Sequence, residues 1–303
     1  MDTTDQHAQH SQHAQHAPQD KKSQAPQATP LGASSSTRAL VHVEVGVDPE
    51  AKLVDAAYAQ AIDARGYLLL PAETSDVEGT ADAGSAAAEY VISLLLTPHV
   101  PMGALEALAP LASMGILDAC AHAGVAQGVL GISWPAGVVR QAGHEPFARI
   151  TTTAGYAAGM FVALSVRMDA AAAQEVFSPA PWQDDSFAED LIACIETCVS
   201  SWEDACINKG YARAPWAPFL PEYFDCVALM GKPVDVRYPN GRVYARGHFV
   251  GIDIWGRATV RTKRAGDIEF AAERFSIAPQ SEPAASGGDD APDGANAPEV
   301  SAS

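Results

Sequence analysis

Apolar and polar positions in the first part of the chain predict alternating strands and helices. Val41–Val47 alternates as a strand does, and Asp48-Pro49-Glu50 then supplies an N-cap, a proline at the first helical position and an early carboxylate. A helix is therefore expected from there to Gly66. Tyr67–Leu70 and Tyr90–Leu96 are apolar runs of strand length, so both are expected to be buried strands.

A longer apolar segment predicts a second helix from Pro101 through Ala123. Its large apolar residues recur at three-residue steps, and a glycine follows its end. Ser186 and Glu189 form a capping box for another helix, which is expected to end near Gly210. Three more apolar runs predict strands: Val129–Trp134, Phe147–Thr153 and Met160–Met168. The order of these elements predicts an α+β fold, in which helices face a mixed sheet.

The last folded part of the chain has the pattern of a small β domain. From Pro233 onward the residues alternate as strands do, with tight turns expected at Asn240-Gly241 and Trp255-Gly256. This spacing predicts a small antiparallel barrel or sandwich.

Both ends of the chain differ from the rest in composition. Residues 1–38 consist mainly of Gln, His, Ala, Ser and Pro, and residues 280–303 of Ala, Gly, Pro and Asp. Such segments bury too little apolar surface to offset the entropy of ordering, so both are expected to be disordered tails around domains at 39–229 and 230–279. Four histidines of the first tail are either candidate metal ligands or part of a polar tail: His7, His10, His13 and His16.

Charge is distributed unevenly over a chain whose formal net charge is −18. Residues 53–208 hold four basic and nineteen acidic side chains, whereas residues 209–279 hold eleven basic and seven acidic ones. This contrast predicts two modules, and the acidic total argues against nucleic acid or an anionic membrane as a partner. Without a signal peptide pattern or an apolar run of about eighteen residues, the expected location is cytoplasmic.

The five cysteines are odd in number and lack the CxxC spacing of a zinc site. They are expected to be reduced and mostly buried. Cys194 and Cys198 share a face of a predicted helix and could join Cys206 in a metal or redox site, although small core residues would show the same spacing.

Several motifs appear in the order found in biotin–protein ligases. The C-terminal part contains Met230-Gly231-Lys232-Pro233-Val234-Asp235-Val236, then Gly251-Ile252-Asp253, then Gly256-Arg257-Ala258-Thr259-Val260. Upstream of them, Ser93–Pro98, Trp134-Pro135 and Ala163–Met168 lie in register. Residues 40–279 as a whole therefore resemble a biotin–protein ligase.

The resemblance implies a fold and an activity. The fold is a class II synthetase-like biotin/lipoate ligase core followed by a small SH3-like antiparallel β barrel. The activity is ATP-dependent biotinylation of a lysine on a biotin carboxyl carrier domain, through biotinyl-adenylate. The implied cofactors are biotin, ATP and Mg²⁺, and a homodimer is left open.

The resemblance also assigns site residues. The loop that closes over biotin and the adenylate phosphate aligns with Glu78, Gly79, Thr80, Asp82 and Gly84. The ligand pocket aligns with Trp134, Pro135, Ala136 and Gly137. The family's strand lysine falls near Glu145 or Pro146, its later asparagine falls at Arg167, and its Ser-Thr-Asn falls at Pro49-Glu50-Ala51.

Cations are scarce where adenylation chemistry needs them. The aligned loop has no arginine, and no lysine occurs between Lys52 and Lys209. Carboxylate attack on a phosphate gathers negative charge that donors must stabilise, so Arg149 and Arg167 become the candidate catalytic residues, with Mg²⁺ recruiting carboxylates. Two alternatives stay open. One is a non-catalytic relative that binds biotin, an acyl group or a carrier domain, and the other is an acyl transferase, for which Cys120 is a poor nucleophile.

Overall fold

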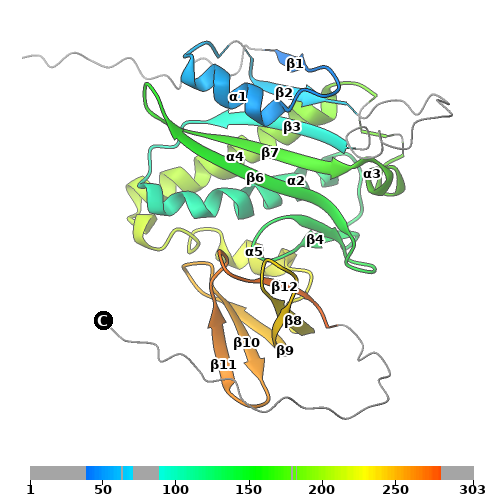
Figure 1. Ribbon diagram of the computed structural model, residues 1–303, viewed down its shortest axis with the longest axis vertical. Helices are drawn as coiled ribbons and strands as arrows, with labels where there is room; N and C mark the ends of the chain where they lie inside the picture. The colour runs from blue at the N-terminus through cyan, green and yellow to red at the C-terminus, as the bar shows by residue number, and fades with distance from the viewer. Residues whose placement is uncertain (1–38, 63, 71–88, 179, 182, 281–303) are drawn as a thin grey trace, which may run out of the picture. The chain divides into compact units, whose positions relative to one another are not determined.

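The structure is a computed structural model that describes residues 39–62, 64–70, 89–178, 180–181 and 183–280 (Figure 1). These residues form two sheets. The first sheet has the strand order β1-β2-β3-β7-β6-β5-β4. Its strands are β1 (Leu40–His42), β2 (Gly66–Leu69), β3 (Glu89–Leu96), β4 (Leu130–Ile132), β5 (Val138–Arg140), β6 (Pro146–Tyr156) and β7 (Met160–Asp169).

The first sheet is mixed. β1 pairs with β2 in parallel, and the other neighbouring strands pair antiparallel. Helices lie on the sheet, with α1 on one face and α2 and α4 packed together on the other (Figure 1). The predicted α+β class is therefore confirmed. The helical elements are α1 (Pro49–Tyr58), η2 (Met102–Ala107), α2 (Leu108–His122), α3 (Ala170–Val176), α4 (Ser186–Asn208), η3 (Tyr211–Arg213) and α5 (Leu220–Cys226).

The two faces of the first sheet bury different amounts of apolar surface. Alternate residues of β3, such as Tyr90, Ile92 and Leu94, point into the large core that α2 and α4 complete. On the opposite face a small cluster contains Leu53 of α1 with Tyr67 and Ala163. The α1 face therefore has room for polar side chains beyond this small cluster.

The second sheet is a five-stranded antiparallel unit with the order β11-β10-β9-β8-β12. Gly241 (φ +80°) and Gly256 (φ +78°) both adopt left-handed backbone conformations, so the two predicted turns are confirmed. The carboxylate of Asp235 is buried in this sheet and accepts from Arg237 and Arg246. The strands are β8 (Pro233–Arg237), β9 (Val243–Ile252), β10 (Ala258–Thr262), β11 (Gly266–Phe270) and β12 (Ser276–Pro279).

The two sheets share one continuous hydrophobic core. The Trp134 indole N–H donates to the carbonyl of Gly256 at 2.9 Å, and the Trp216 backbone N–H donates to the carbonyl of Ile254 at 3.3 Å. The turn that follows β9 is therefore attached to the first sheet's core by hydrogen bonds as well as by packing. The domain boundary predicted between residues 229 and 230 stays a prediction.

The helix predicted to reach Gly66 ends earlier, at Tyr58. Gln60 adopts a positive φ of 54°, and the N–H of Ala61 donates to the carbonyl of Ala56, which closes the helix end. The left-handed residue at this helix end is Gln60 and not a glycine, so the sequence contains no glycine that marks the end of α1.

The predicted capping box at Ser186 is wrong. Asp185 is the N-cap residue, and no side chain caps the helix from that position. Ser186 instead donates both its backbone N–H and its hydroxyl to Asp184. The sequence prediction also lacked three short elements, β5, α3 and α5.

One continuous helical segment, Met102–His122, is long and apolar enough to cross a membrane by composition. The fold buries 61% of its most apolar window. It packs against α4 as a core helix, which explains its apolar composition.

Candidate functional site

A group of charged and hydroxyl side chains occupies the sheet face at the start of α1. Arg149 of β6 and Arg167 of β7 are directly paired across the two strands. Glu89 begins the neighbouring strand, β3, and lies close enough to bind both guanidinium groups. We call this set the arginine cluster, and its members are Asp48, Glu50, Glu89, Arg149, Thr151, Thr153 and Arg167.

Carboxylates separate the two arginines. Arg149 donates to Glu89 at 2.5 Å, and a nitrogen of Arg167 lies 3.6 Å from the other oxygen of Glu89. Arg167 also donates to Asp48 at 2.9 Å. Because like charges directly opposite each other on a sheet repel, Glu89 stabilises a pairing that would otherwise be unfavourable.

The N-terminus of α1 contributes the other half of the cluster. Asp48 accepts from the Glu50 backbone N–H at 2.9 Å and so caps the helix, as its sequence predicts. The carboxylate of Glu50 accepts from the hydroxyls of Thr151 and Thr153, at 2.6 Å each. The helix end and β6 are thereby held together by side-chain hydrogen bonds.

Charge and exposure decide what this cluster can bind. It combines two guanidinium groups with three carboxylates, which leaves one negative charge in excess. The Arg149 side chain is 70% exposed and that of Arg167 only 23% exposed. Arg149 can therefore turn toward a ligand at little cost, whereas Arg167 is held in place from two sides. The cluster offers donors for an anion and carboxylate ligands for a divalent cation.

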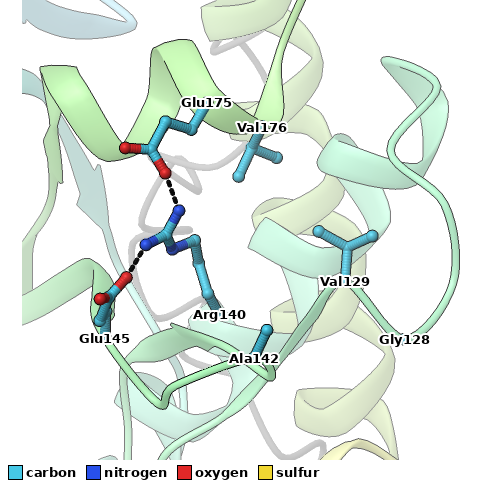
Figure 2. Close-up of a pocket in the computed structure, with 7 residues that line it drawn as sticks. All are labelled: Gly128, Val129, Arg140, Ala142, Glu145, Glu175 and Val176. Atoms are coloured by element: carbon cyan, nitrogen blue, oxygen red, sulfur yellow. Dashed lines mark hydrogen bonds and ion pairs between the residues drawn. The ribbon is translucent and has the colours of Figure 1, made fainter.

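A separate cavity of about 440 Å³ lies at one end of the first sheet (Figure 2). Figure 2 shows the guanidinium of Arg140 between the carboxylates of Glu145 and Glu175, with an ion pair to each. Val129 and Val176 supply apolar wall. Sequence reasoning did not single out Arg140, although it is one of only four arginines in the acidic span and thus carried a usable signal.

Comparison of the fold with solved structures identifies its type. The chain is similar to the apo structure of the biotin protein ligase from Aquifex aeolicus, with a TM-score of 0.53 and 12% identity, covering 80% of this chain and 100% of that chain. A point mutant of that ligase in complex with biotin gives a TM-score of 0.51 and 13% identity, covering 80% of this chain and 99% of that chain. The chain has a biotin protein ligase-like fold.

A third structure of this type adds a nucleotide to the comparison. It is the Aquifex aeolicus ligase in complex with biotin and ATP, which gives a TM-score of 0.50 and 12% identity, covering 80% of this chain and 99% of that chain. No family model and no curated protein matches the sequence.

The Trp134–Gly137 segment of the ligase-like fold is held by internal hydrogen bonds. Trp134 is 3% exposed and bonded to Gly256, while the carbonyl of Pro135 accepts from the Tyr223 hydroxyl at 2.8 Å. The N–H of Gly137 donates to the hydroxyl of Ser113 at 2.9 Å. The segment thus stabilises the core. Its role in a ligand pocket, including that of Ala136, stays a prediction.

The remaining candidates have different outcomes. The aligned loop with Glu78, Gly79, Thr80, Asp82 and Gly84 lies outside the described residues, and so do His7, His10, His13 and His16. Cys120 is buried, and burial raises the pKa of its thiol to about 12, with Cys194 adding to the shift. Such a thiol is protonated at neutral pH and is a poor nucleophile.

Glu145 forms an ion pair with Arg140 at the cavity of Figure 2. Burial lowers the pKa of His144, and the nearby positive charge of Lys232 lowers it further. The position that the resemblance assigns to the family's strand lysine therefore carries a carboxylate that is already neutralised.

Proposed function

We propose that the protein is a divergent biotin–protein ligase, which activates biotin with ATP and transfers it to a lysine of a biotin carboxyl carrier domain. The observation that carries this proposal is the side-by-side placement of Arg149 and Arg167 on β6 and β7, at the N-terminus of α1. A pair of guanidiniums is the kind of donor set that a carboxylate or a phosphate requires.

The residues of the arginine cluster fit biotin, and they fit ATP when a divalent cation binds with it. Arg149 and Arg167 would hold the anionic groups of biotin or ATP, and Asp48 and Glu89 would hold Mg²⁺. Bound ATP supplies the adenylyl group that activates the biotin carboxylate. Because the cluster has one negative charge in excess, a polyphosphate fits only together with a divalent cation.

A second candidate function is a binding protein of the same fold without adenylation activity. The observation that favours it is that both guanidiniums already have carboxylate partners. An arginine engaged in this way offers less charge to a developing phosphate anion than a free one. Such a protein would hold biotin, an acyl group or the carrier domain and would leave the ligand unmodified.

Calorimetric titration of the full chain with biotin, alone and with ATP and Mg²⁺, tests both functions, together with biotin transfer to a purified carrier domain. The informative variant is Arg149→Gln, because this exposed side chain can be replaced without disturbing the core. Arg261→Gln is the matched control, since Arg261 is an exposed arginine of the second sheet with a carboxylate partner, Asp267.

Ligase function predicts biotin binding that strengthens with ATP and Mg²⁺, and transfer to carrier lysine. It also predicts a loss of transfer of about a hundredfold or more in Arg149→Gln, with Arg261→Gln unchanged. Biotin binding without transfer would identify the non-catalytic alternative. If neither biotin binding nor transfer occurs, the ligase function and the biotin-binding form of the alternative are both wrong.

A further inference from the structure

Three side chains that commonly bind metal ions meet on the helical layer of the first sheet, on the opposite face from the arginine cluster. His122 is the last residue of α2, and Asp190 and Cys194 lie one turn apart on α4. The two helices pack against each other (Figure 1). The imidazole, carboxylate and thiol atoms of the three residues all lie within 4.8 Å of one another.

The separations within this set are close to those around a bound metal ion. Nδ1 of His122 lies 3.0 Å from Oδ2 of Asp190 and 3.7 Å from the sulfur of Cys194. Ligand atoms around a tetrahedral zinc ion, with bonds of about 2.0–2.3 Å, lie about 3.3–3.7 Å apart. Small side-chain rotations therefore suffice to bring the three donors into one coordination sphere.

Charge and environment also suit a divalent cation. A neutral imidazole, a carboxylate and a thiolate together carry two negative charges, which a divalent ion neutralises. A thiol binds zinc as the thiolate, so metal binding at this set releases the proton of Cys194.

The set is accessible from solvent. The side chains of His122 and Asp190 are 63% and 39% exposed, so the site opens to solvent. Three protein ligands and an open fourth position match the arrangement of zinc sites that keep a bound water.

An ordinary surface ion pair would explain why His122 and Asp190 are close, but it would not explain the position of Cys194. His122 and Asp190 would form such a pair without help, but the buried sulfur of Cys194 adds a third donor of the type that zinc prefers. We propose that His122, Asp190 and Cys194 form a binding site for a zinc-type divalent metal ion, with water as the fourth ligand. This site uses none of the residues proposed for the ligase function.

Cobalt(II) titration of the metal-free full chain tests the site by absorption spectroscopy. Each protein carries alanine at His7, His10, His13 and His16, so that the histidine tail binds no cobalt. A thiolate bound to cobalt gives a charge-transfer band in the near ultraviolet, which imidazole or carboxylate ligands do not give. We expect one equivalent of cobalt to produce this band and zinc to remove it by displacement.

The variants identify the ligands. Cys194→Ser should abolish the band, and His122→Ala should weaken cobalt binding at least about tenfold. Cys206→Ser is the matched control, because Cys206 is buried on the same helix outside the proposed site, and it should leave the band unchanged. His122 lies exposed at a helix end, so its variant tests the proposal even if Cys194→Ser does not fold. No band at saturating cobalt, or a band unaffected by His122→Ala, overturns the proposal.

Discussion

The indole of Trp134 donates its single hydrogen bond to the carbonyl of Gly256 inside the core. At the residue scale, we expect Trp134→Phe to lower the free energy of unfolding by roughly 1–3 kcal/mol, because it leaves this buried carbonyl without its donor. Urea denaturation measures the loss.

The matched control is Trp255→Phe. Trp255 is 49% exposed, and its indole donates to the carbonyl of Arg213 at 3.1 Å. Water can replace that donor, so we expect a change within about 0.5 kcal/mol. Equal losses in the two variants would mean that the Trp134 hydrogen bond is not what stabilises the junction.

The arginine cluster illustrates what a sequence reveals about single residues. Arg149 and Arg167 stood out because cations are scarce between Lys52 and Lys209. Their partners did not stand out, because the pairing of Arg149 with Arg167 depends on the register of β6 with β7. The contact of Glu89 with both depends in turn on the neighbouring strand, β3. Register is set by side-chain packing across the whole sheet, which a single sequence does not state.

At the element scale, α2 and α4 approach closely at Gly115. A Cβ atom added there would lie 2.9 Å from both the backbone nitrogen and the Cα atom of Ile195. We expect Gly115→Ala to lower the free energy of unfolding by about 1–3 kcal/mol, even though alanine favours a helix by about 1 kcal/mol. Chemical denaturation monitored by circular dichroism measures the effect.

Gly103→Ala controls for helix propensity. Gly103 lies in η2, and an added Cβ atom meets nothing within 4 Å. This variant should be neutral or slightly stabilising. If Gly115→Ala were as stable as Gly103→Ala, the close approach of the two helices would be refuted.

Elements with strong local signals were predicted well, and those without them were not. Asp48-Pro49 marked the start of α1, and the two glycine turns of the second sheet were placed correctly. The end of α1 was not, because Gln60 carries out a role that usually falls to glycine. At Ser186 the local capping pattern was present, but Asp184 competes for the same hydrogen bonds. The short strand β5 depends on its pairing with β4 and β6. The helix α3 was missed although its local signal is present, since Asp169 caps a run of alanines.

At the scale of the whole molecule, buried tyrosines make stability depend on pH in the alkaline range. Burial raises the pKa of Tyr223 well above its ordinary value of 10.0, and the neighbouring Cys226 adds to the shift. Above pH 10 the unfolded chain releases this proton while the folded protein retains it, so the free energy of unfolding must fall as the pH rises.

The measurement compares wild type with Tyr223→Phe between about pH 9.5 and 11.5. The variant loses the hydrogen bond to Pro135, which lowers its stability by a similar amount at every pH. Its decline with pH should be shallower by about 1.4 kcal/mol per pH unit. Tyr90 also has a raised pKa, chiefly from burial, but contributes equally to both proteins. Two parallel curves would contradict the expectation.

The order of the motifs predicted the whole fold more closely than the distribution of charge along the chain did. The contrast between the acidic first part and the basic last part suggested two modules. The structure has two sheets, and apolar residues such as Trp134 and Trp216 belong to the core that both sheets share. The division into two domains stays a prediction. Charged residues lie mainly on the surface, whereas the contacts that join the two sheets are buried and apolar. The distribution of charge therefore does not predict those contacts.

The hydrogen bond between Trp134 and Gly256 has a consequence for biosynthesis. The ribosome releases the chain from its N-terminus, so the indole emerges 122 residues before the carbonyl that it binds. Until then the indole N–H can donate only to water or to another group, and the apolar ring lacks part of its final packing. Maturation of the first sheet is therefore completed by a segment that is translated 122 residues after Trp134.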